Sequence, residues 1–210
     1  MYTSEVEISS DQFLRLDSIS DLARLLSISS GMLIYASLSP VYSTFRIPKK
    51  AGGYRLIEAP EKQLKSRQRI IANHLQAVYL TIKPESAHGF ISSWEEGSGT
   101  FNIISNASIH TGKKFVLNID LKDFFHDFSA GRVRNIFMAP PFSFHHQLAS
   151  LLAIITTYYN KLPMGAPTSL VLSNLACLEM DKKMEALALQ LGWNYSRYAD
   201  DLTYSLDEPG

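Results

Sequence analysis

The chain has 210 residues and a mass of 23.6 kDa, a size typical of one or two domains. Hydrophobic residues make up 46% and charged residues 19%, which excludes a chain disordered throughout and allows a sizeable core. The single cysteine, Cys177, excludes an intramolecular disulfide and a zinc site built from cysteines. No apolar run is long enough to span a bilayer and the N-terminus lacks a signal-peptide pattern, so we expect a soluble, cytoplasmic protein with no membrane partner.

The charge is unevenly distributed along the chain. Basic and acidic residues number 20 each, so the net charge indicates no nucleic-acid partner by itself. Residues 46–69, however, contain eight basic and two acidic side chains. A run of this kind is usually a solvated surface. The alternative is a surface that binds nucleic-acid phosphates, and the motifs described below favour that alternative.

The first half of the chain predicts helices around one hairpin. Residues 20–26 are typical of a short helix capped by Ser20. Residues 44–48 and 54–58 predict two strands joined by a basic, glycine-rich tip. The spacing of apolar residues from Leu64 to Ile82 then predicts an amphipathic helix.

The second half of the chain mixes strands and helices. The nearly continuous apolar run 115–119 predicts a buried strand. Helices are predicted around 133–137, over 148–155 and over 170–191, and a strand hairpin over 195–206. Because strands and helices do not alternate regularly, the sequence favours the α+β class.

Three aspartates stand at predicted strand ends. Asp120 follows the apolar run, and Asp200 and Asp201 lie at the tip of the last hairpin. Each alone is explained as a turn residue, because aspartate bonds nearby backbone N–H groups. An adjacent pair is less well explained in this way, since a hairpin that needs only a turn favours Asn-Gly or Asp-Gly. Divalent cations bind clustered carboxylates, and of two cations roughly 3.5–4 Å apart one can activate an attacking oxygen and the other stabilise a leaving oxygen.

Several motifs resemble those of one enzyme family. Tyr198-Ala199-Asp200-Asp201 is similar to the catalytic signature of reverse transcriptases. Residues 118–125 resemble the first aspartate motif of that family, and residues 162–169 resemble the loop-and-helix segment between the two. The order and approximate spacing of the three motifs also agree with the family.

Further motifs narrow the resemblance to retron-type reverse transcriptases, over about residues 21–205. Residues 47–55 are similar to the fingers hairpin of bacterial reverse transcriptases. His88-Gly89-Phe90 and the Asn-Ala-x-x-His element at 106–110 are similar to retron elements. The resemblance implies the fingers and palm of a right-hand polymerase, with an antiparallel palm sheet packed on helices and no thumb. It also implies three segments: an N-terminal helical segment (1–43), the fingers (44–114) and an incomplete palm (115–210). Within the palm, residues 126–165 would be partly a fingers-like insertion.

The resemblance implies a role for each motif residue. Asp120 and Asp200 would be the principal metal ligands and Asp201 the third carboxylate, holding two Mg²⁺ ions, with Mn²⁺ as an alternative. Phe125 would be an aromatic gate against the ribose 2′-OH, or else plain core packing. The other residues expected to contact the nucleotide are Lys50, Arg55, Leu121 (through its backbone), Met164 and Gly165. The residues expected to contact template RNA are Lys49, Arg67, Asn106 and His110; for Asn106 and His110 a structural role is an equal alternative.

The chain departs from the family pattern in its loop and at its end. Met164 stands where the family usually has glutamine, and Leu170 where it has proline; a thioether cannot make the amide's hydrogen bonds, so nucleotide affinity or fidelity is expected to change. The chain ends at Gly210, before the primer grip and thumb of the family. We therefore expect a fragment, a natural truncation or one half of a split enzyme.

The resulting hypothesis is an RNA-directed DNA polymerase of retron type. It would transfer dNTPs onto a primer hydroxyl, with a structured RNA as template and primer, and give a branched RNA–DNA product. The resemblance further implies anti-phage defence and an effector protein as partner. One alternative is a group II intron-like or other defence-associated reverse transcriptase; another is a non-catalytic RNA-binding module.

Overall fold

The structure is a computed structural model that describes residues 4–49, 52–92 and 101–207. The helices are α1 (Ser4–Leu14), α2 (Ile19–Leu25), α3 (Ser30–Leu38), α4 (Lys62–Ile82), α5 (Ile103–Ser108), α6 (Ala130–Met138), α7 (His146–Thr156) and α8 (Pro167–Leu191), with a 3₁₀ turn η1 (Phe124–Asp127). The strands are β1 (Tyr42–Pro48), β2 (Tyr54–Pro60), β3 (Phe115–Asp120), β4 (Asn194–Tyr198) and β5 (Asp201–Leu206). The α+β class is confirmed. None of the helices within these ranges is both long and apolar enough to cross a membrane.

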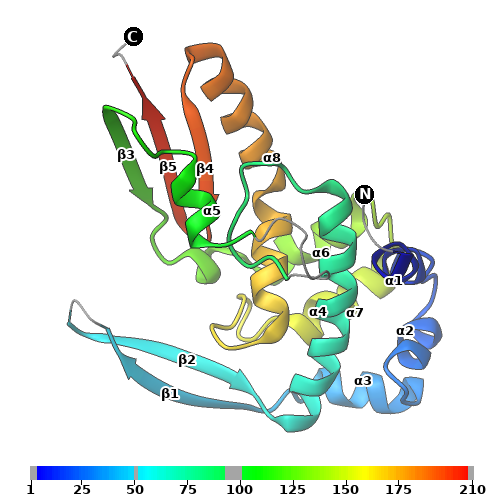
Figure 1. Cartoon of the computed structure of the whole chain (residues 1–210). Helices are drawn as coiled ribbons and strands as arrows, with labels where there is room; N and C mark the ends of the chain where they lie inside the picture. Colours follow the sequence, from blue (N-terminus) through cyan, green and yellow to red (C-terminus); the bar gives the residue numbers. More distant parts are fainter. Residues whose placement is uncertain (1–3, 50–51, 93–100, 208–210) are drawn as a thin grey trace.

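The N-terminal helices α1, α2 and α3 lie together at one side of the molecule, beside α4 and α7 (Figure 1). Helix α2 begins one residue before Ser20, so the predicted cap is wrong. Ser18 caps the helix instead: its hydroxyl accepts a bond from the N–H of Asp21 at 3.1 Å, and the Asp21 carboxylate accepts one from the N–H of Ser18 at 3.0 Å. This reciprocal capping box satisfies two N–H groups that have no partner within the helix.

Strands β1 and β2 form the predicted hairpin, which projects from the helical body (Figure 1). They pair antiparallel from Tyr42 opposite Pro60 to Pro48 opposite Tyr54. The base of the hairpin is fixed by the buried carboxylate of Glu58, which lies 3.1 Å from the Lys161 ammonium and 3.6 Å from the His126 ring. These contacts tie β2 to the segments that follow β3 and α7.

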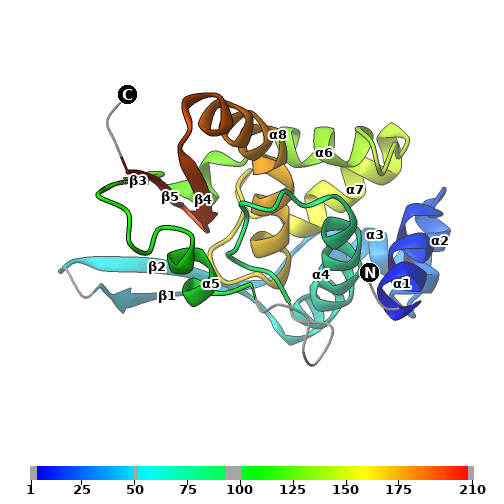
Figure 2. The same ribbon diagram turned by 45° about the horizontal axis from the view of Figure 1, so that its top comes forward.

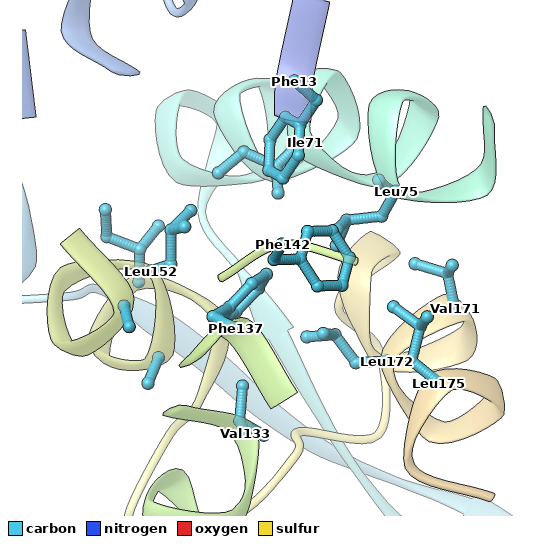
Figure 3. Packing of buried hydrophobic residues seen from close by; sticks show 14 of the residues in the cluster. Phe13, Ile71, Leu75, Val133, Phe137, Phe142, Leu152, Val171, Leu172 and Leu175 are labelled. Carbon is cyan, nitrogen blue, oxygen red and sulfur yellow. The ribbon is translucent and has the colours of Figure 1, made fainter. Parts of the chain in front are cut away.

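One main hydrophobic core joins the helices. Figure 3 shows Phe13 of α1, Ile71 of α4, Phe137 of α6, Leu152 of α7 and Leu172 of α8 converging on it. All five side chains are fully buried. The core therefore contains residues from all three predicted segments, and the division at residues 43 and 114 stays a prediction.

The second sheet has the strand order β3–β5–β4 and is antiparallel throughout. Helix α8 packs against β4, and α5 also contacts β4 (Figure 2). Tyr195, Leu202 and Tyr204 of the sheet form a small apolar cluster with Ala188 of α8. An antiparallel palm sheet packed on helices is the arrangement that the family resemblance predicts.

The prediction that residues 115–119 form a buried strand is wrong about burial. The strand forms as β3, but all six of its residues are exposed. Its position explains the difference: β3 is an edge strand that pairs with β5, whereas the helices that cover the sheet pack on β4. An apolar run predicts a strand, but which strand lies at the edge is decided by the tertiary arrangement.

Candidate active site

The three predicted metal ligands lie where β3 ends and β5 begins. This end of the β3–β5–β4 sheet faces the β1–β2 hairpin (Figure 1). Asp120 at the end of β3 lies directly opposite Asp201 at the start of β5. Side chains at opposed positions of antiparallel strands share a face, with Cβ atoms about 4.5–5.5 Å apart. The N–H of Leu121 donates to the carbonyl of Asp200 at 2.9 Å and extends the pairing onto the turn. Strand register thus brings the backbone positions of the three acids together, and their role as metal ligands stays a prediction.

The turn between β4 and β5 is a two-residue loop. Tyr198 pairs with Asp201, so Ala199 and Asp200 form the loop between them. Ala199 has φ 61°, in the left-handed region that alanine seldom adopts, and its side chain is buried. A positive φ at the first loop position suits the twist of a tight hairpin. The loop therefore places Asp200 directly before Asp201, the first residue of β5.

The carboxylates influence one another electrostatically. The pKa of Asp201 is raised, first by partial burial and then by the charges of Asp200 and Asp120. Within the described ranges, no three acidic, histidine or cysteine side chains converge closely enough to hold a metal ion. The donor chemistry nevertheless fits a hard divalent cation, because oxygen ligands are those that Mg²⁺ and Mn²⁺ prefer and a cation would offset the repulsion.

A pocket of about 390 Å³ lies between the hairpin, η1 and the start of α8. It is lined by Arg55, Ile57, Lys65, Arg69, Phe125, Pro163, Met164, Gly165, Ala166, Pro167, Ser169 and Leu170. Four of the residues predicted to contact the nucleotide thus share one pocket: Arg55, Phe125, Met164 and Gly165. A fifth, Lys50, lies outside the described residues. Strand β2, the 3₁₀ turn and the loop 162–166 come from distant parts of the sequence, so only the fold brings them together.

Two basic residues of this pocket were not singled out from the sequence. Lys65 and Arg69 of α4 line it together with Arg55 of β2. They belong to the basic run 46–69, which the sequence predicts only as a surface for nucleic-acid phosphates. Their spacing of four residues is the signal that could have identified them, because it places both side chains on the same face of a helix. The pocket therefore has three cationic groups, a suitable set for a triphosphate.

The segment that follows Asp120 is a 3₁₀ turn rather than a strand. In a strand, Phe124 and Phe125 would point to opposite faces. In the turn their rings are 5.4 Å apart, and Phe124 is buried whereas Phe125 is partly exposed and lines the pocket. Phe125 also contacts Phe90 with a centroid separation of 5.8 Å. Its ring thus packs on the core and faces the pocket at once.

The loop that contains Met164 and Gly165 lies against β2. The carbonyl of Met164 accepts a bond from the N–H of Glu58 at 3.3 Å. Gly165 has φ 153°, and a Cβ there would lie 2.9 Å from the carbonyl oxygen of Glu58. Only glycine allows this approach without displacement of the loop or the strand. The contact explains how the loop is fixed beside Arg55.

The remaining nucleotide and template candidates are placed less favourably. The N–H of Leu121 is occupied by Asp200, so the predicted backbone contact with a triphosphate is not supported at that atom. Arg67 points toward α3, where its guanidinium lies 3.7 Å from the sulfur of Met32. Lys49 is exposed at the hairpin tip, as a template contact requires. The roles of Arg67 and Lys49 stay predictions.

The structure favours the structural alternative for His110. Its ring is buried and contacts both β4 and β5: Nδ1 lies 2.7 Å from the hydroxyl of Ser205 and Nε2 lies 2.7 Å from that of Ser196. Burial lowers the pKa of His110, so the ring is neutral at pH 7. Asn106 is also buried, and its Oδ1 has no partner among the described residues. Neither side chain is exposed for template RNA in this arrangement.

We expect replacement of His110 by phenylalanine to lower the free energy of unfolding by about 1–3 kcal/mol at pH 7.5, because two buried hydroxyls lose a partner. In the parent, stability is expected to fall as the pH drops below about 6.5, where the unfolded chain takes up a proton that folded His110 still excludes. The variant should lose less over that range. Urea unfolding at pH 7.5 and 5.5 measures both effects. His88, whose pKa is also lowered, is present in both proteins, so identical pH dependence would contradict the prediction.

Residues 47–209 match the family described as reverse transcriptase (RNA-dependent DNA polymerase). The match covers most of the chain, and the chain belongs to this family. The relatives with which it aligns include several retron reverse transcriptases, as the motifs predict. The chain is 34% identical to the retron Mx65 reverse transcriptase of Myxococcus xanthus, over 90% of this chain and 47% of that protein. It is 32% identical to the retron Ec86 reverse transcriptase of Escherichia coli, over 87% of this chain and 54% of that protein. The chain thus spans about half the length of the relatives it matches.

Proposed function

We propose that this chain carries the fingers and the catalytic edge of the palm of an RNA-directed DNA polymerase of retron type. The observation that carries the proposal is the placement of Asp120 directly opposite Asp201, beside the loop residue Asp200. The three-cation pocket that includes Phe125, from the turn that follows β3, supports it. The similarity to retron reverse transcriptases favours this reading over a group II intron-like or other defence-associated enzyme.

Each group has a defined task in the proposed reaction. Asp120, Asp200 and Asp201 would hold two divalent cations, Mg²⁺ or Mn²⁺, which when bound activate the primer hydroxyl and stabilise the leaving oxygen. Arg55, Lys65 and Arg69 would bind the phosphates of the incoming dNTP through charge-assisted hydrogen bonds; Lys65 and Arg69 are additions to the residues predicted from sequence. Phosphoryl transfer depends mainly on positioning and electrostatic stabilisation, so these contacts account for much of the expected rate.

Primer extension tests the proposal. The full-length gene product is given an RNA template with a primer, dNTPs and Mg²⁺, and incorporation is compared with that on a DNA template. Incorporation on RNA supports the proposal. A protein that binds RNA independently of Mg²⁺ but incorporates nothing supports the non-catalytic RNA-binding module instead. Met164 is the observation that favours this second candidate, because it lines the pocket without an amide.

We expect Phe125→Val to increase the use of ribonucleotides. The ring lines the pocket, and its removal opens space where a 2′-OH would lie. The ratio of kcat/KM for rNTP to that for dNTP should rise by about tenfold or more. Phe45→Val, at an exposed aromatic that is not among the pocket residues, is the matched control. An unchanged ratio in Phe125→Val would leave the ring with a packing role only.

The proposed partners follow from the same reading. The template and primer would be a structured RNA, the product a branched RNA–DNA molecule and the substrates dNTPs. An effector protein and a role in anti-phage defence, in the cytoplasm, complete the proposal. Co-purification of a DNA-linked RNA with the full-length protein would support the retron reading directly.

A further inference from the structure

A fully buried ion pair joins β4 to α8. The side chains of Arg197 and Asp181 are both 0% exposed. Two parallel hydrogen bonds connect them, from Nε to Oδ1 at 2.8 Å and from Nη2 to Oδ2 at 2.7 Å. Burial alone lowers the pKa of Arg197, but the bonds and charge of Asp181 outweigh it and raise that pKa, so the arginine stays charged. The cost of removing both charges from water offsets much of the attraction in a buried ion pair. A gain in stability is therefore a weak explanation for the presence of this pair.

The third nitrogen of the guanidinium reaches the catalytic turn. Nη1 of Arg197 donates to the carbonyl of Ala199 at 2.9 Å and to Oδ1 of Asn174 at 3.1 Å. Ala199 is the buried, left-handed residue directly before Asp200. The arginine side chain therefore holds the backbone of the loop that presents two of the three carboxylates. A planar guanidinium bound at all three nitrogens has little freedom to move.

The same network reaches the segment 86–89. The second polar atom of the Asn174 amide, Nδ2, donates to the carbonyl of Gly89 at 2.9 Å. The backbone of Arg197 pairs with this segment as well: its N–H donates to Ser86 at 2.8 Å, and its carbonyl accepts from His88 at 2.9 Å. Helix α8, segment 86–89 and the turn are thus connected through two side chains, Arg197 and Asn174.

We propose that Arg197 is a positioning residue for the metal-binding carboxylates. Held by Asp181 and Asn174, it fixes the carbonyl of Ala199 and through it the direction in which Asp200 and Asp201 point. The inference rests on the proposed function for the identity of the site. It assigns the buried pair a task in positioning the site, although both side chains are fully buried.

A purely structural role predicts a different pattern among variants. Tyr195 also donates to Asp181, through its hydroxyl to Oδ1 at 2.9 Å. It has no bond to the turn among the contacts of the described residues. Tyr195→Phe therefore removes a buried bond from the same carboxylate without releasing Ala199. If the network serves only stability, variants of Tyr195 and Arg197 should differ from the parent in unfolding free energy but not in metal affinity.

The experiment measures binding of Mn²⁺ alone by titration calorimetry, in the full-length protein and well below the unfolding temperature of each variant. Binding that is lost in Asp200→Asn/Asp201→Asn defines the site. Arg197→Lys, which keeps the charge but not the three-nitrogen fork, should raise the Kd for Mn²⁺ about 10- to 100-fold, the effect typical of residues that orient metal ligands. Tyr195→Phe should stay within about twofold of the parent. Asn174→Ala, which retains the ion pair, should raise the Kd for Mn²⁺ by an intermediate factor. If Arg197→Lys does not fold, the affinity of Asn174→Ala tests the inference instead.

The outcomes separate this inference from the proposed function. A folded Arg197→Lys and a folded Asn174→Ala with parental Mn²⁺ affinity would overturn the inference, as would a parent protein without Asp200- and Asp201-dependent Mn²⁺ binding. A parent that binds Mn²⁺ but incorporates no dNTP would overturn the polymerase function, and the affinities of the variants would still decide the role of Arg197. In an active parent, Arg197→Lys should also raise the Mg²⁺ concentration for half-maximal incorporation.

Discussion

Replacing both Asp200 and Asp201 by asparagine is expected to abolish DNA synthesis without loss of the fold. Loss of a single electrostatic group at a reacting centre typically costs about 10²–10³-fold in rate, so a decrease of more than about 10³-fold is expected for two carboxylates that share the metal ions. Incorporation of labelled dNTP on an RNA template measures the loss. Asp123→Asn is the matched control: it neutralises an exposed acid three residues after Asp120, at φ 52°, which asparagine adopts readily.

The double variant Asp200→Asn/Asp201→Asn should be at least as stable as the parent at neutral pH. The pKa of Asp201 is raised in the folded state by burial and by its acidic neighbours. A raised carboxyl pKa means that ionisation of the group destabilises the folded state. This destabilisation is complete at pH values above the raised pKa and is absent below about pH 3.9, the ordinary pKa of aspartate. Neutral asparagines remove this repulsion, so thermal unfolding at pH 7 should occur at an equal or higher temperature than in the parent.

Added Mg²⁺ provides a second contrast between the two proteins. A ligand that binds only the folded state raises the unfolding temperature, so Mg²⁺ should stabilise the parent but not the double variant. DNA synthesis by the folded double variant at the parental rate would rule out the assignment of these carboxylates. A variant that fails to fold would contradict the stability argument, because Asp200 is only partly buried and Asp201 is exposed.

Local features of the fold could be predicted because their causes are local. The glycine-rich tip at residues 52 and 53 and the alternating strands beside it define the β1–β2 hairpin, which the structure confirms. The hairpin that carries Asp200 follows in the same way from two strand-like runs around a short turn. The end of the apolar run at Asp120 locates the third acid. Strand periodicity and turn chemistry are properties of neighbouring residues, so a sequence shows them directly.

The features that could not be predicted depend on contacts between distant segments. The exposure of β3 follows from its edge position in the order β3–β5–β4. Arg197 is fully buried, contrary to the usual behaviour of arginine, because Asp181 lies opposite it on a separate element. Arg55 and Lys65 share a pocket only because β2 and α4 fold against the loop 162–166. No short pattern encodes these approaches.

We expect Gly89→Ala to be the most damaging single substitution outside the carboxylates and the ion pair. A Cβ at Gly89 would lie 2.3 Å from the backbone nitrogen of Ala199 and 3.1 Å from the carbonyl carbon of Tyr198. Both are main-chain atoms, so the overlap cannot be relieved by rotation of a side chain. Either segment 86–89 or the catalytic turn must move. The resemblance of His88-Gly89-Phe90 to a family motif thus has a steric explanation at its central residue.

The displacement should affect catalysis more than folding. A misplacement of about 1 Å at a reacting centre costs about 10²-fold in rate, whereas overpacking typically costs about 1–3 kcal/mol of stability. Incorporation per folded molecule is therefore expected to fall about 10²-fold, with urea unfolding used to determine the folded fraction. Gly131→Ala is the matched control, since a Cβ there lies 3.8 Å from Ser129 Oγ, an ordinary contact, and alanine favours the helix. Full activity in folded Gly89→Ala would show that the turn tolerates a shift of this size and that its position is not fixed by segment 86–89.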